Sequence, residues 1–128
     1  MIRAKGAERV ILVSDSVKFA GMPPGRYTSP IGGDIEVSSN GRVSIFGNKF
    51  LAGSGVSLLK IICNFSNLTG LPFCTGVAMA TKNPAKFLNR SVDLKPGKRA
   101  DFILFDLDNT TGTAQPRDIV FSGESVMQ

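Results

Sequence analysis

The first clear pattern in the chain is an unbroken apolar run, Val10–Val13, followed by Ser14 and Asp15. A short continuous run of β-branched and aliphatic residues is typical of a strand that is buried on both faces of a parallel sheet. The pattern therefore predicts a buried strand over residues 10–14, with the Asp15 carboxylate at its exit. Because the rest of the sequence does not clearly supply parallel neighbours for it, we expect this strand to be part of a larger fold.

Gly and Pro dominate the next stretch, residues 19–33, which predicts a long ordered loop. Two apolar segments, 34–37 and 42–46, then flank Asn40 and Gly41. Asn-Gly is the strongest short-range signal for a hairpin because both residues accept a positive φ. We expect a β-hairpin at this position.

Helical periodicity begins after the hairpin. Apolar residues recur at three- and four-residue spacing over residues 56–68, with hydroxyl residues before them and Gly70 after them, which predicts an amphipathic helix. Two shorter helical segments are expected next, one that starts at Pro72 and one that is capped by Asn83. A further strand is predicted over residues 101–106, and residues 118–121 followed by 123–126 are expected to form a closing strand or hairpin, with a polar connector over residues 110–116.

The amino-acid composition limits the kinds of catalytic and metal sites that this chain can form. The 128 residues are 42% hydrophobic and include no His, which excludes a Ser-His-Asp triad or a His-rich zinc site within this chain. Cys63 and Cys74 lie among apolar residues, so we expect both to be buried thiols. No apolar run has the length of a spanning helix, and the start of the chain does not resemble a signal peptide. A soluble, cytoplasmic protein without membrane contact is expected.

The net charge of +5 raises the question of nucleic-acid binding. Basic residues occur along the length of the chain with acidic residues among them, and no interleaving of basic and aromatic residues marks a stacking platform. We therefore expect a solvated basic surface and no nucleic-acid partner.

Five motifs occur in one order, and together they cover nearly the whole chain: Ile11–Ser16, Gly21–Tyr27, Leu51–Ser54, Met79–Ala85 and Pro96–Phe102. In order and spacing they resemble the C-terminal third of N-acetylglucosamine-6-phosphate deacetylases of the amidohydrolase superfamily. The fourth and fifth of these motifs are shared by many amidohydrolases and indicate only the superfamily. The second and third narrow the resemblance to the sugar deacetylases.

The resemblance implies an α/β fold, the C-terminal fragment of a (β/α)₈ TIM barrel with the C-terminal strands of a small β-sandwich. Residues 1–93 would form the end of the barrel, with residues 10–14 as its last strand, and residues 94–128 would belong to the sandwich. Other polypeptide would have to complete the barrel, since a typical one needs about 250 residues.

By the same resemblance, Asp15 is the catalytic aspartate, which takes a proton from a metal-bound water and passes it to the departing amine. The substrate-binding segment would be Leu51, Ala52, Gly53 and Ser54, where small residues let backbone amides approach the sugar. The alternative for Asp15 is a plain strand-terminating residue, and the alternative for Gly53 and Ser54 is a role as helix caps. Arg26 fits a phosphate clamp less well than a hairpin-anchoring role.

The family's metal ligands have no counterpart in this sequence. We therefore expect no cofactor to be bound by this chain, although the resemblance implies a divalent metal, zinc or iron, for the complete enzyme. Expected partners are a phosphorylated amino sugar and either the missing upstream barrel portion or further copies of the chain. The isolated chain is expected to be inactive. The alternatives are a non-catalytic module that pairs with another chain, and an amidohydrolase that acts on a cyclic amide or on a different N-acyl sugar.

Overall fold

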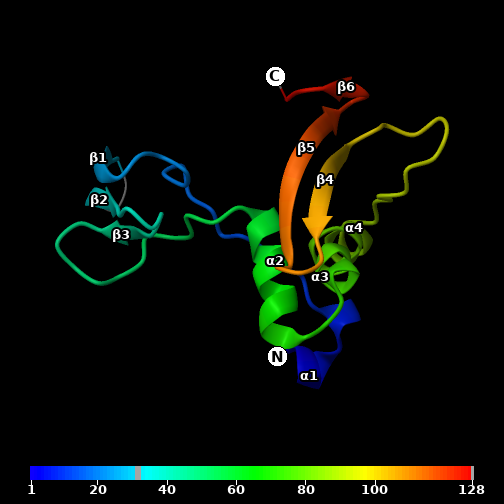
Figure 1. The fold of residues 1–128 in the computed structure, drawn as a ribbon, viewed down its shortest axis with the longest axis horizontal. Helices are drawn as coiled ribbons and strands as arrows, with labels where there is room; N and C mark the ends of the chain where they lie inside the picture. Colours follow the sequence, from blue (N-terminus) through cyan, green and yellow to red (C-terminus); the bar gives the residue numbers. More distant parts are fainter. Residues whose placement is uncertain (31–32, 128) are drawn as a thin grey trace. The chain divides into compact units, whose positions relative to one another are not determined.

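The computed structural model describes residues 1–30 and 33–127 and has mixed α/β content (Figure 1). In chain order its helices and strands are α1 (Ile2–Lys5), a short 3₁₀ turn (Ala7–Arg9), β1 (Gly25–Ser29), β2 (Gly33–Val37), β3 (Val43–Ile45), α2 (Leu58–Thr69), α3 (Phe73–Ala80), α4 (Lys82–Phe87), β4 (Phe102–Asp108), β5 (Thr113–Phe121) and β6 (Glu124–Ser125). Residues 13–61 form one compact unit, and residues 1–12 with 62 onward form the other. Within the described residues, no helix combines the length and apolarity needed to cross a membrane.

The predicted hairpin is confirmed as β2 and β3, which pair antiparallel from Val37–Val43 outward. Its turn differs from the expected one. The Gly41 amide donates to the Ser38 carbonyl at 2.9 Å, and the Ser38 amide donates to the Arg42 carbonyl at 3.0 Å. Only Gly41, with φ 79°, has the left-handed backbone here. The connection is therefore a three-residue loop in which the glycine, not the Asn-Gly pair, supplies the positive φ.

The predicted loop over residues 19–33 is wrong in part, because β1 lies within it and pairs antiparallel with β2. Pro24 and Pro30 bound this strand without interrupting its hydrogen bonds, as proline is tolerated at strand ends. Residues 31–32 of the expected loop lie outside the described residues. Behind the sheet, one core forms from four buried side chains: Phe19, Ile35, Val37 and Val43.

Arg26 anchors this sheet, as expected. It lies on β1, is paired with Asp34 on β2, and its guanidinium lies 3.8 Å from the ring centroid of Phe46. The sequence thus identified Arg26 as a structural residue of the sheet β1-β2-β3 rather than as a phosphate clamp.

The helices of the other unit follow the expected periodicity. α2 ends at Gly70, which has φ 68° and donates its amide to Ser66 at 2.9 Å. It buries three residues on one face: Ile62, Cys63 and Phe65. Cys63 is buried as expected, but Cys74 is exposed, because it lies on the outer side of α3 while Gly76 and Met79 lie on the buried side.

Asn83 plays a different part from the expected helix cap. α4 begins one residue earlier, and the Asn83 side-chain amide donates to the carbonyls of Ala7, at 2.8 Å, and Val10, at 2.6 Å. A bond from the Leu12 amide to the Met79 carbonyl, at 3.0 Å, joins the same segment to α3. These bonds hold the N-terminal segment against two helices that are some seventy residues away in sequence.

The predicted strand over residues 10–14 is not formed: the segment is extended, without sheet partners, and Ile11 and Val13 are exposed. A buried-type strand needs neighbours on both edges, and no strand among the described residues supplies them. The predicted C-terminal strands are confirmed as the antiparallel sheet β4-β5-β6. The expected connector over 110–116 is shorter than predicted, because β5 already begins at Thr113.

Candidate functional site

Asp15 lies where the extended N-terminal segment meets the chain that leads into α2. Ser16 and Ser54 form an isolated parallel bridge, in which the Ser54 amide donates to the Asp15 carbonyl at 2.9 Å and the Val17 amide donates to the Ser54 carbonyl at 3.2 Å. Asp15 itself has φ 53°, a left-handed conformation that Asp tolerates better than most residues. Sequence-distant backbone therefore fixes the position of the Asp15 Cα.

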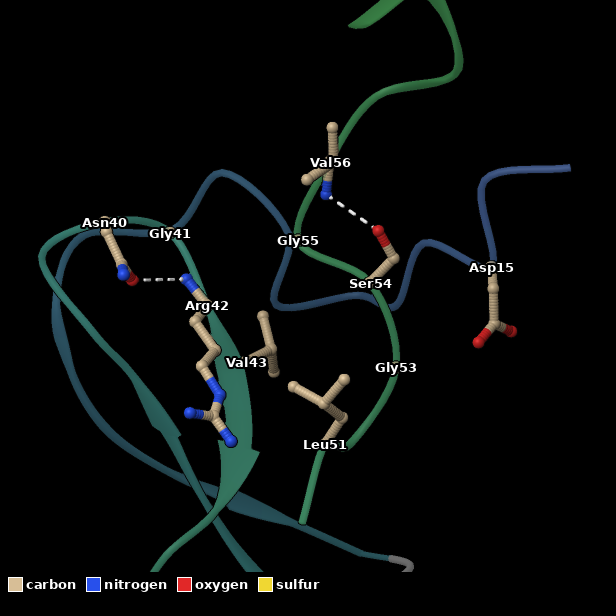
Figure 2. Close-up of a pocket in the computed structure, with 10 residues that line it drawn as sticks. All are labelled: Asp15, Asn40, Gly41, Arg42, Val43, Leu51, Gly53, Ser54, Gly55 and Val56. Atoms are coloured by element: carbon tan, nitrogen blue, oxygen red, sulfur yellow. Dashed lines mark hydrogen bonds between the residues drawn. The ribbon is translucent and has the colours of Figure 1, made fainter. Parts of the chain in front are cut away.

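Two serine hydroxyls reinforce this junction. The Ser16 hydroxyl donates to the Val56 carbonyl at 2.7 Å, and the Ser54 hydroxyl accepts from the Val56 amide at 3.1 Å. Figure 2 shows the Ser54 side chain directed toward Val56 and away from the Asp15 carboxylate. Ser54 thus organises the backbone of the site and leaves the carboxylate without a hydroxyl partner.

A cavity of about 500 Å³ adjoins the Asp15 carboxylate (Figure 2). Its lining residues are Asp15, Asn40, Gly41, Arg42, Val43, Leu51, Gly53, Ser54, Gly55 and Val56. Four of the five predicted site residues are therefore brought together: Asp15, Leu51, Gly53 and Ser54. Asp15 is exposed, so within this chain its carboxylate faces solvent rather than an enclosed barrel mouth. These residues build only one side of a pocket.

Ala52, the fifth predicted site residue, faces the other way. It packs against the hydrophobic core beside Val17 and Ile45 and lines a different cavity. Its amide donates to the Val43 carbonyl at 3.1 Å, and the Ser54 amide is likewise bonded, so neither is available to a ligand. Between them, the Gly53 amide has no acceptor within the described residues, and its φ of 104° is one that glycine accommodates most easily.

The alternative role of Gly53 and Ser54 as helix caps is wrong. α2 begins at Leu58, and Ser57 caps it by accepting the Lys60 amide at 3.3 Å. Instead, Leu51 forms an isolated antiparallel bridge with Ser44, and Ser54 forms the parallel bridge with Ser16.

Sequence reasoning missed the contribution of the hairpin turn to this cavity. Arg42 lines it while its guanidinium donates to the Lys49 carbonyl at 2.6 Å. Gly55 allows the turn to come close, since a Cβ at residue 55 would lie 2.0 Å from the Gly41 carbonyl oxygen. The Asn-Gly signal located the turn, but no local pattern indicated that the turn would lie against residue 55.

The described residues do not form a metal centre. The sequence has no His, and the described residues contain no group of three or more His, Cys, Asp or Glu that could hold an ion. Asp15 has no second acidic residue beside it among those that line the cavity. The residues present therefore do not fit a resident divalent metal.

Asp15 thus lies beside an open cavity together with Leu51, Gly53 and Ser54. The chain belongs to the amidohydrolase family, whose family model matches residues 1–127. A putative N-acetylgalactosamine-6-phosphate deacetylase of Escherichia coli strain K12 is 39% identical over 104 residues, which are 77% of this chain and 59% of that relative. An N-acetylgalactosamine-6-phosphate deacetylase of Escherichia coli O157:H7 is also 39% identical over 104 residues, which are 77% of this chain but only 26% of that relative.

Among solved structures, the chain is similar to N-acetyl-D-glucosamine-6-phosphate deacetylase from Mycobacterium smegmatis, with a TM-score of 0.80 and 27% identity. The similarity covers 98% of this chain and 33% of that one. The chain thus spans about a third of the solved relative and less than two thirds of either curated relative.

Proposed function

We propose that this chain supplies the catalytic carboxylate, Asp15, to an amidohydrolase that removes the acetyl group from an N-acetylated amino-sugar 6-phosphate. The observation that carries the proposal is the meeting of Asp15 with Leu51, Gly53 and Ser54 at one cavity, in a chain of the amidohydrolase family. The reaction is hydrolysis of N-acetylglucosamine 6-phosphate to glucosamine 6-phosphate and acetate, or of the galacto epimer. The chain is 39% identical to two N-acetylgalactosamine-6-phosphate deacetylases and 27% identical to the solved N-acetylglucosamine-6-phosphate deacetylase. Both sugar phosphates are therefore tested as substrates.

In this reaction Asp15 acts as a proton shuttle. Its carboxylate accepts a proton from the attacking water and delivers a proton to the departing amine nitrogen. The Gly53 amide, which has no acceptor among the residues that the structure describes, is available to donate to a sugar or acetamide oxygen. The bonds of Ser16 and Ser54 hold the Asp15 backbone in place, so they are positioning residues.

The remaining groups of the site, including any ligands of the divalent zinc or iron that the family resemblance implies, come from residues outside this sequence. We propose that residues 1–93 form the end of a (β/α)₈ barrel and residues 94–128 the strands of a β-sandwich subdomain. The similarity of 98% of the chain to one continuous deacetylase structure supports this assignment. Such a chain acts as a soluble cytoplasmic part of amino-sugar metabolism.

A chimera tests the proposal. The region of the O157:H7 enzyme that matches this chain is replaced by the chain, and acetate release is measured with both sugar phosphates and with their unphosphorylated forms. The chimera is expected to be active, and Asp15→Asn to lower kcat by about 10²–10⁴-fold, the usual contribution of a proton-transferring side chain. Asp106→Asn, a substitution on exposed β4, serves as the matched control. An Asp15→Asn chimera as active as its parent contradicts the proposal, as does acetate release by the isolated chain.

A second candidate is a non-catalytic module that pairs with another chain. Exposure of Ile11 and Val13 on an unpaired extended segment favours it, because free strand edges recruit partners. A fully active chimera would argue against this candidate, whereas a chimera that is folded but inactive would argue for it.

A further inference from the structure

The positive charge of this protein is concentrated in one segment of the chain. Six of its fifteen basic residues and only one of its ten acidic residues lie between residues 82 and 99, and the remaining nine of each kind cancel. This segment, which runs from α4 to the start of β4 (Figure 1), therefore carries the whole net charge of +5.

Two adjoining cavities lie on this segment, far in sequence from Asp15. One, of about 430 Å³, is lined by Arg90, Ser91, Val92, Asp93, Leu94, Lys98, Arg99 and Asp101. The other, of about 380 Å³, is lined by Lys82, Ala85, Lys86, Arg90, Ser91, Val92 and Asp93. Four residues, 90–93, are shared by both. Both are depressions that are open to solvent.

The acidic residues at these cavities are already engaged. Asp93 lies 3.0 Å from the Lys95 ammonium, whose hydrogen bond and charge hold the pKa of Asp93 below its usual range. Asp101 is paired with Arg99 and also accepts the Ser122 amide. By contrast, four lining cations have no acidic group within ion-pair distance among the described residues, although the charge of the first also helps to lower the pKa of Asp93: Lys82, Lys86, Arg90 and Lys98.

We propose that these two cavities bind a small molecule that carries two or more linked phosphoryl groups, with Arg90 shared between them. Unpaired cations held together repel one another, and a multiply charged anion removes that repulsion. Arg90 suits the shared position because a guanidinium binds phosphate oxygens in a bidentate manner. Lys82 and Lys86 bind one phosphoryl group, and Lys98 binds the other.

The surroundings favour a small ligand over a nucleic acid. Phe87 is the sole aromatic residue between 82 and 99, so the sequence of this segment provides no series of stacking platforms for bases. The cations also gather around two joined depressions, which matches a compact anion better than an extended polymer.

Calorimetry on the full chain with pyrophosphate and tripolyphosphate as probes tests the proposal. We expect saturable binding of one probe molecule per chain that weakens as salt is raised. Arg90→Gln is expected to weaken binding about tenfold or more, the loss that follows from removing one charge-assisted contact. Lys60→Gln, which removes an exposed positive charge on α2 instead, is expected to change the affinity less than about twofold. Adenosine triphosphate in a parallel titration shows whether the ligand's phosphates come with a nucleoside.

Circular dichroism checks that Arg90→Gln is folded, and Lys86→Gln repeats the test at a second lining cation. Binding that does not saturate, or that falls equally in Arg90→Gln and Lys60→Gln, overturns the proposal because it indicates a diffuse charge effect. Tighter binding of a uridine oligonucleotide than of tripolyphosphate at equal salt overturns it in favour of nucleic acid. None of these measurements depends on deacetylase activity, so failure here is distinct from failure of the proposed function.

Discussion

Glycine at residue 55 lets two backbone segments of the candidate site approach each other. Residue 55 lies against the hairpin turn, where a Cβ would stand 2.0 Å from the Gly41 carbonyl oxygen. Because that oxygen belongs to the backbone, no rotation of a side chain relieves the clash. The cavity beside Asp15 therefore depends on a residue that performs no chemistry itself.

We expect Gly55→Ala to destabilise the hairpin unit by about 1–3 kcal/mol, the usual cost of forcing an extra methyl group into a packed position. Urea unfolding measures the loss. Gly25→Ala is the matched control, since its added Cβ would meet only Tyr27, at an ordinary 3.8 Å. Equal stability of the two variants would show that the turn and residue 55 are not in contact in solution.

Pairing between strands, rather than loop chemistry, organises the sheet β1-β2-β3. Arg26 on β1 and Asp34 on β2 are an ion pair across this sheet, and the Arg26 hydrogen bond and charge hold the pKa of Asp34 below its usual value of 3.8. A carboxylate whose pKa is lowered in the folded state stabilises that state above its unfolded pKa, and the contribution disappears as the pH falls through the folded pKa.

Asp34→Asn is therefore expected to lower stability at pH 7 and to lose its effect below pH 3.8, as the wild-type carboxylate becomes protonated. Thermal melts of both proteins from pH 7 to pH 2.5 give the comparison. A stability difference that stays constant over this whole range would mean that the pair does not form in solution.

The N-terminal segment is held by one side chain of α4. Asn83→Ala removes two hydrogen bonds, to Ala7 and Val10, so we expect a loss of about 1–3 kcal/mol and faster hydrogen exchange at the Leu12 amide. Asn64→Ala, an exposed asparagine on α2, is expected to change stability by less than about 0.5 kcal/mol. Unchanged exchange at Leu12 in Asn83→Ala would argue that α3 alone fixes the segment.

Across the whole molecule, large apolar side chains remain in solvent. Phe50, Leu68 and Phe87 are 74%, 85% and 80% exposed, and other large apolar side chains of the described residues are exposed as well. We expect the purified chain to bind a hydrophobic dye and to elute from size exclusion ahead of a 13.6 kDa monomer. A compact monomer with a single cooperative melt and no dye binding would show that no partner is needed.

Local patterns in the sequence were sufficient for the hairpin at Asn40-Gly41, for α2 with its Gly70 terminus and for the C-terminal strands. Each depends on turn geometry or side-chain periodicity, which are properties of neighbouring residues. The choice of Asp15 and Leu51–Ser54 as one group came instead from the resemblance to the deacetylases, and the structure brings all of them except Ala52 to one cavity. The tertiary structure decided that β1 forms inside a Gly- and Pro-rich stretch, that residues 10–14 stay unpaired, and that Ala52 faces the core. These outcomes depend on which distant segments are present to form hydrogen bonds and cover apolar surface, and a strand pattern alone does not reveal its partners.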